Sequence, residues 1–170
     1  MKKLALASVL AGSLVAAAAF AGEKAAAPAA AAPPAAAAPK MTVTAYADLK
    51  WQPLDPKNPG GLHISIIDGD VFKGPTTFYL KLPAGMKASG SHAHTNDYFG
   101  VVIAGAPAHG LSDKELGKGL AIGSTWFQPG KEQHYDACTG DKDCVILLHY
   151  PRGGFDYIPG PAPAAAPAKK

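Results

Sequence analysis

Two histidines separated by a single residue, His92 and His94, are the side chains of this 170-residue protein best suited by type and spacing to do chemistry. In a β-strand, residues two apart lie on the same face, so both imidazoles can bind one metal ion. The chain has six histidines, all between His63 and His149. By itself the triplet is equally compatible with two surface histidines, so its surroundings decide how it is interpreted.

Glycines, a proline and a further histidine surround the triplet. A first motif consists of Gly85, His92, His94 and Gly105. A second motif consists of Gly123, Pro129, Gly130 and His134. Together they resemble the two motifs of the cupin superfamily over most of residues 51–157, in particular small secreted single-domain cupins and cupins attached to anti-sigma factors. The resemblance implies a jelly-roll β-barrel of six to eight strands, with His92, His94 and His134 as metal ligands in its mouth.

One position departs from the family's pattern. Four residues after His94, where the family most often has a glutamate ligand, this chain has Tyr98. Its even spacing from the two histidines directs its side chain to the same face. A phenol is a poorer ligand than a carboxylate because its reference pKa is about 10. Three interpretations stay open: a three-histidine site with open positions, a Tyr98 phenolate ligand, or Tyr98 as a catalytic residue that orients or protonates bound substrate.

Other polar residues near the motifs are weaker candidates. Asn96 and Asp136 each lie two residues after a motif histidine, which also directs them inward. His63, His109 and His149 have the opposite alternation, and His109 closely follows a proline. We expect these three histidines to be structural or exposed.

Cys138 and Cys144 flank a five-residue polar turn. If they face each other across a hairpin, their Cα atoms lie about 4.5 to 5.5 Å apart, within disulfide range. Because the N-terminal segment predicts export to an oxidising compartment, we expect a structural disulfide. The alternative, in which the thiolates join the metal, is disfavoured because Cys138 lies two pleats beyond His134 and would point past the ion.

The elements that must position these side chains are short strands. Six apolar or β-branched runs recur between Gly, Pro, Asp and Asn residues: 41–47, 62–67, 76–82, 98–104, 120–128 and 145–150. Phe78, Leu80 and Leu82 alternate with polar or amphipathic neighbours, as in a half-buried strand. No window keeps helical periodicity over ten residues. The pattern predicts an all-β sandwich or barrel.

The ends of the chain differ from its centre. Residues 1–21 have the basic, apolar and small-residue order of a secretory signal peptide, so we expect cleavage after Ala21 and a periplasmic or secreted protein. Residues 22–40 and 161–170 are rich in Ala and Pro and predict a disordered linker and tail. The single cupin-like domain is then residues 41–160. We expect no stable membrane insertion after cleavage.

The charge of the chain argues against a nucleic-acid partner. The formal net charge is +3, but residues 41–160 carry 10 basic and 12 acidic residues. No run of lysine and arginine is longer than two. Since phosphate contacts need a concentrated basic face, we expect no nucleic acid to bind.

The leading functional hypothesis is a secreted metal-dependent cupin enzyme that acts on a small molecule, of oxidoreductase or dioxygenase type. The metal would be divalent Fe, Mn, Ni, Cu or Zn, among which the sequence does not choose. The alternative is a non-catalytic module of the cell envelope that binds or senses a metal ion or small ligand. A metal-free barrel with a vestigial site is a third reading. Analogy with cupins also predicts a possible homodimer.

Overall fold

The computed structural model describes residues 40–161, where regular structure consists of ten short strands and one 3-10 turn. The predicted signal peptide (1–21), all but the last residue of the linker (22–40) and all but the first residue of the tail (161–170) lie outside the described residues. Within the described part, no helix has the length and apolar character needed to cross a bilayer. The predicted all-β class is confirmed.

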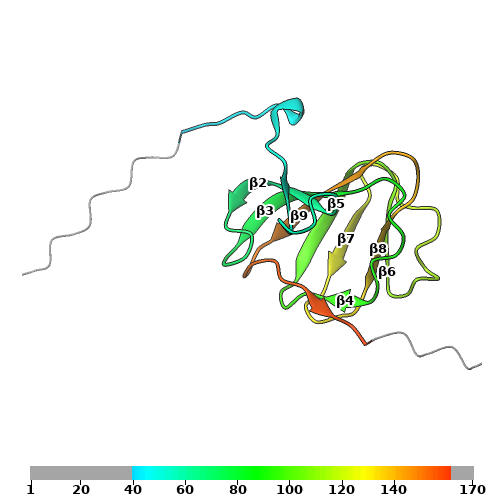
Figure 1. The fold of residues 1–170 in the computed structure, drawn as a ribbon. Helices are drawn as coiled ribbons and strands as arrows, with labels where there is room; N and C mark the ends of the chain where they lie inside the picture. Colours follow the sequence, from blue (N-terminus) through cyan, green and yellow to red (C-terminus); the bar gives the residue numbers. More distant parts are fainter. Residues whose placement is uncertain (1–39, 162–170) are drawn as a thin grey trace, which may run out of the picture. The chain divides into compact units, whose positions relative to one another are not determined.

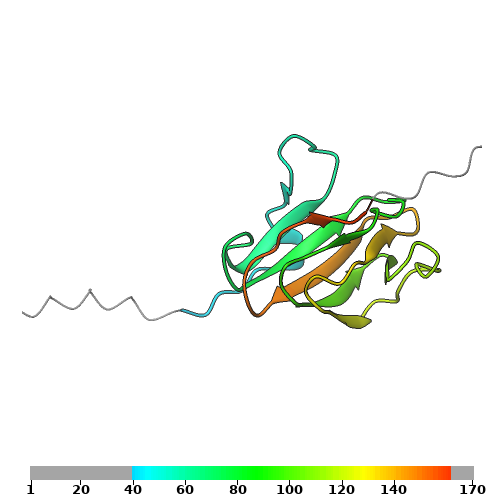
Figure 2. The same cartoon turned by 90° about the horizontal axis from the view of Figure 1, so that it is seen from below.

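The largest sheet has six antiparallel strands in the order β1-β2-β3-β9-β5-β7. These strands are β1 (Gln52–Pro53), β2 (His63–Gly69), β3 (Thr76–Leu82), β9 (Cys144–Tyr150), β5 (Tyr98–Ala104) and β7 (Thr125–Gln128). The long strands β3, β9 and β5 run side by side in the middle of the sheet (Figure 1 and Figure 2). They provide one broad wall of the barrel.

Two pairs of short strands complete the barrel. β4 (His92–Ala93) pairs with the C-terminal strand β10 (Ile158–Pro159), which lies beside it in Figure 1. β6 (Pro107–Gly110) pairs with β8 (Tyr135–Cys138). His92 lies in β4 and Asp136 in β8, and His94 and His134 lie next to the ends of these strands, whereas the large sheet carries most of the buried apolar residues.

Alternate residues of β3 and β9 form the core. Phe78 pairs with Leu148 and Leu80 with Ile146, and all four side chains are buried. The predicted alternation in β3 is confirmed, since every second residue from Thr76 to Leu82 is buried. Cross-strand apolar pairs on one face are the usual source of sheet stability, and here they also form the floor of the site.

Of the six predicted strands, one does not form and one is shorter than predicted. The run 41–47 forms no strand: Met41 and Val43 are 92% and 86% exposed, and only the 3-10 turn Tyr46–Asp48 follows. The run 120–128 shortens to β7, because Gly123 adopts a φ of 86° and turns the chain before the strand begins. Apolar content alone predicted both strands, but a strand also needs a neighbour to pair with.

The predicted disulfide between Cys138 and Cys144 is confirmed, with a Cα–Cα distance of 5.7 Å. The predicted hairpin is not: Cys138 ends β8, which pairs with β6, whereas Cys144 begins β9 in the large sheet. The bond therefore joins two sheets rather than two strands of one hairpin. It also excludes these sulfurs as metal ligands, since both are oxidised.

We expect replacement of both cysteines by serine to lower the free energy of unfolding by about 2 kcal/mol, because the bond closes a short loop in the unfolded chain. Denaturant unfolding of the metal-free protein measures this difference. Reduction of the wild-type protein should reproduce it, while the double variant should be insensitive to reductant. Equal stability of oxidised wild type and double variant would contradict the role of the disulfide.

Candidate metal centre

Backbone pairing brings the two histidine motifs together. His92 and His134 form an antiparallel bridge in which each backbone N–H donates to the other's carbonyl, at 3.0 and 2.8 Å. The carbonyl of His94 accepts from Lys131 N at 2.7 Å. As a result the three predicted ligands lie together: one ligand nitrogen from each of His92, His94 and His134 lies within 4.8 Å of the other two. All three side chains are buried.

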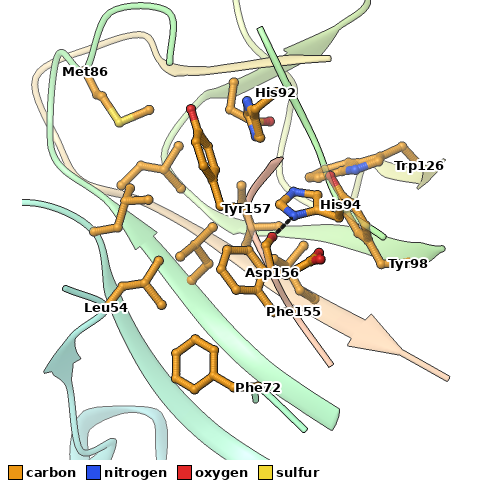
Figure 3. A pocket seen from close by; sticks show the side chains of 16 residues that line it. Leu54, Phe72, Met86, His92, His94, Tyr98, Trp126, Phe155, Asp156 and Tyr157 are labelled. Atoms are coloured by element: carbon orange, nitrogen blue, oxygen red, sulfur yellow. Dashed lines mark hydrogen bonds and ion pairs between the residues drawn. The ribbon is translucent and has the colours of Figure 1, made fainter. Parts of the chain in front are cut away.

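Each of these imidazoles is oriented by a backbone carbonyl. His92 Nδ1 lies 3.1 Å from Gly90 O and His134 Nδ1 lies 3.2 Å from Glu132 O. His94 Nδ1 donates to Asp156 O, a contact drawn as a dashed line in Figure 3. Because Nδ1 donates in each ring, Nε2 is left as the basic nitrogen. Such anchoring is typical of metal-binding histidines, so the three residues fit a divalent transition metal.

Asp136 adds a carboxylate to the three-histidine group. Its Oδ2 lies 3.3 Å from His92 Nε2 and 3.8 Å from His134 Nε2. Its other oxygen, Oδ1, lies 2.8 Å from His109 Nδ1. The alternation after His134 predicted the inward direction of Asp136, and the structure confirms it. The sequence did not reveal that Asp136 contacts three histidines.

His109, which was expected to be structural or exposed, is not exposed: it lies at the site itself, where it contacts Asp136. Its side chain is 10% exposed and stacks on Trp126, with ring centroids 4.8 Å apart. Its Nε2 lies 2.9 Å from Gln128 Oε1. The alternation counted from His94 fails because Gly105, with a φ of 74°, ends β5, and β6 then belongs to another sheet. His109 pairs in register with Asp136 there.

Burial and the Asp136 carboxylate set the protonation of this group. Burial lowers the pKa of His94, and it lowers the pKa of His134 to about 4. Burial also acts to lower the pKa of His92, but the hydrogen bond and charge of Asp136 outweigh it and raise that pKa. Burial acts to raise the pKa of Asp136, whereas hydrogen bonds from His109 and His92 hold it well below its ordinary value. At neutral pH, Asp136 is therefore a carboxylate beside the neutral imidazoles of His94 and His134.

Tyr98 lies in the site but keeps its proton. Its hydroxyl is 3.3 Å from His134 Nε2. Burial, reinforced by the nearby negative charge of Asp136, raises the pKa of Tyr98 well above its usual value. Since His134 Nδ1 is the donor of that ring, the Tyr98 O–H donates to Nε2. Of the three interpretations of Tyr98, the structure favours a protonated phenol beside the histidines over a phenolate ligand.

The remaining candidates lie away from the site. Asn96 donates from Nδ2 to Gly154 O at 2.9 Å and so holds a loop rather than facing the histidines. His149 is exposed and contacts the hydroxyl of Thr77 at 2.9 Å, and the Nδ1 of His63 contacts the carbonyl of Gly61 at 3.0 Å. The prediction that these two histidines are structural or exposed is confirmed.

A cavity of about 470 Å³ opens beside the histidines, between the short strands and the large sheet. His92, His94 and Tyr98 line its polar end, as Figure 3 shows, and Asp136 belongs to the same lining. Its apolar wall includes six aliphatic residues: Leu54, Leu62, Leu80, Leu82, Ile146 and Leu148. Among residues 40–161, no lysine or arginine lines the cavity. The space therefore suits an apolar molecule with a polar group at one end.

The structure is similar to several solved structures. One is an RmlC-like cupin protein from Ralstonia eutropha, with 21% sequence identity, a TM-score of 0.53, and coverage of 69% of this chain and 72% of that chain. A protein of unknown function with a cupin-like fold, also from Ralstonia eutropha, has 14% identity, a TM-score of 0.54, and coverage of 75% and 99%. The polyketide cyclase RemF from Streptomyces resistomycificus has 14% identity, a TM-score of 0.54, and coverage of 74% and 89%.

These similarities identify the fold. No protein-family model matches the sequence, and no curated protein matches it. At these identities a structural likeness speaks for fold and leaves function to be argued from the site. The chain has the cupin jelly-roll fold, as its two histidine motifs predicted.

We expect the metal-free protein to become less stable as the pH falls from about 6.5 to about 4. The pKa of His134 is lowered from 6.5 to about 4 on folding, so in this window the unfolded chain binds more protons and acid favours unfolding. One such group changes the free energy of unfolding by roughly 1 kcal/mol per pH unit. Urea unfolding between pH 4 and 8, with a chelator present, measures this slope.

The variant His134→Gln should have a flatter profile, whereas the exposed His149→Gln should keep the wild-type slope. His92 acts in the opposite sense, because its raised pKa gives stability at low pH that is lost as the pH rises through it. Asp136, with a lowered pKa, gives stability that is lost only below about pH 4. An unchanged slope in His134→Gln would show that another group controls this window.

Proposed function

We propose that this protein is a metal-dependent cupin that takes a small, largely apolar molecule with one oxygen-bearing polar end. One observation carries the proposal: three buried imidazoles, each anchored through Nδ1 to a carbonyl, meet at the polar end of an apolar cavity of about 470 Å³. Anchored imidazoles are a typical metal-ligand set, and the cavity has the size of a small-molecule site.

His92, His94 and His134 would hold the ion, which would act as a Lewis acid toward a bound oxygen. The chain's own residues supply orientation. Tyr98 places an O–H donor at the histidines, and Asp136 places negative charge there. The apolar wall excludes water from the rest of the ligand, which strengthens polar interactions at the metal end.

If the protein is an enzyme, the proposed reaction is an oxidation of dioxygenase type. Imidazole ligands suit Fe, Mn, Ni, Cu and Zn, of which the redox-active ions serve such chemistry. Oxygen uptake by the Fe- or Cu-loaded protein with a panel of phenols and enols tests it. Stoichiometric binding of these compounds without any turnover would reject it.

A non-catalytic binding or sensing module is the second candidate. It is favoured by the state of Asp136 and Tyr98 at the polar end of the cavity, since Asp136 is held by histidines and burial keeps Tyr98 protonated. Neither group is poised to exchange a proton near neutral pH. In this case the protein would retain ligand and ion unchanged.

A periplasmic or secreted location is part of the proposal. The sequence of residues 1–21 supports it, as does the disulfide, because such bonds persist in oxidising compartments. Cell fractionation, with detection of the protein in each fraction, tests this location. Recovery of the protein from the cytoplasm with residues 1–21 still attached would contradict it.

We expect the purified protein to bind about one equivalent of a divalent transition metal, and His92→Ala and His134→Ala to lose it. Removing one of three ligands should weaken binding by at least about 100-fold, since even the loss of supporting residues around a metal costs 10- to 100-fold. Metal content after dialysis, measured by mass spectrometry, tests this.

The matched control is His149→Ala, an exposed histidine whose loss should leave metal content unchanged. Circular dichroism of each variant separates loss of metal from loss of fold. Wild-type protein that binds none of Fe, Mn, Ni, Cu or Zn would overturn the metal-dependent function.

We also expect the cavity to prefer 2-naphthol over a sugar phosphate of similar size by at least about tenfold, because apolar burial is favourable and no basic side chain faces the phosphate. Met86→Lys, which introduces a charge into the cavity lining, should weaken 2-naphthol binding. The control Leu111→Lys alters an exposed residue elsewhere. Calorimetry measures both, and tighter binding of the sugar phosphate would contradict the proposed ligand class.

A further inference from the structure

We propose that Asp136 is the fourth protein ligand of the metal, so that the carboxylate missing from the first motif comes from β8. The inference rests on the proposed function, because it concerns the same metal. In the family's motif the carboxylate follows the second histidine, at the position that Tyr98 occupies here. The structure supplies a carboxylate to the same group from another strand, two residues after His134.

Of the two contacts that Asp136 Oδ2 makes with the metal-site histidines, the shorter has the length expected of donors that share an ion, and the longer exceeds it slightly. Two donors each bound at about 2.1 Å to one metal lie roughly 3.0 to 3.6 Å apart when their bonds meet near 90° to 120°. Asp136 Oδ2 lies 3.3 Å from His92 Nε2 and 3.8 Å from His134 Nε2. Each of those nitrogens belongs to a ring whose Nδ1 is anchored to a carbonyl. Oδ2 is therefore placed among the metal-facing nitrogens of the site.

The other oxygen of Asp136 is held by neighbouring side chains, as the second oxygen of a metal-bound carboxylate usually is. Oδ1 lies 2.8 Å from His109 Nδ1, and His109 Nε2 lies 2.9 Å from Gln128 Oε1. The Gln128 amide nitrogen donates in turn to Pro129 O and to Glu132. This chain of contacts fixes the carboxylate with one oxygen free to bind the ion, as outer residues do for metal-bound carboxylates.

The second carboxylate near the histidines, Asp156, is already engaged elsewhere. Both of its oxygens accept from Thr95, one from the backbone N–H at 2.8 Å and the other from the hydroxyl. Its backbone carbonyl, rather than its side chain, contacts His94. Among the described residues, Asp136 is thus the acidic side chain that contacts the imidazole group itself.

Cobalt(II) binding to the purified protein tests this assignment, because the visible spectrum of Co²⁺ responds to a change of ligand. We expect Asp136→Asn to lower Co²⁺ affinity at least about 100-fold, as for the histidine ligands, and to change the positions and intensities of the visible bands. His109→Gln should lower affinity less and leave the band pattern unchanged, because it removes a support and not a ligand. The control Asp113→Asn, an exposed carboxylate, should match wild type in both.

The outcomes separate the two proposals. Wild-type protein that binds no Co²⁺ overturns both the proposed function and this inference. Loss of binding in His134→Ala, with wild-type affinity and spectrum in Asp136→Asn, overturns the inference alone. If Asp136→Asn does not fold, a crystal structure of the metal-loaded wild type decides: an Asp136 oxygen within about 2.3 Å of the ion supports the assignment, and one beyond 3 Å rejects it.

Discussion

The site depends on one short piece of backbone pairing, the bridge between His92 and His134. These two residues belong to motifs 42 positions apart in the chain, and neither lies within a long strand. Two reciprocal hydrogen bonds place their side chains next to each other, and the C-terminal strand β10 then pairs with β4 from its other side. The same pairing aligns β8, so that Asp136 follows His134 into the centre.

This arrangement explains how several histidines can be buried together. Four protonated imidazoles in so small a volume would repel one another, and burial already disfavours their charged forms. In this fold a single carboxylate contacts three of the imidazoles. Backbone carbonyls fix which ring nitrogen carries the proton. Burial lowers the pKa of His134 to about 4, so that its Nε2 is unprotonated at neutral pH.

The sequence predicted the parts of this site that depend on local alternation. His92, His94 and Tyr98 share a face because they are separated by even numbers of residues within an extended segment, and Asp136 follows His134 for the same reason. His109 could not be placed this way, because the chain passes from one sheet to another after Gly105. The alternation of side chains along β5 therefore does not continue into β6. The same limit applies to the disulfide: the short spacing of the cysteines predicted the bond, but only the fold shows that it joins two sheets.

Gly100, which has no side chain, shows why packing cannot be predicted from motifs alone. Gly100 lies opposite Trp126 in the pairing of β5 with β7, and a Cβ there would meet the indole ring at 2.2 Å. The missing side chain lets Trp126 lie over the strand, where it lines the cavity and stacks on His109. His109 in turn contacts Asp136. The shape of the ligand cavity and the position of the carboxylate are therefore set by the same contact, between a glycine and a tryptophan on neighbouring strands.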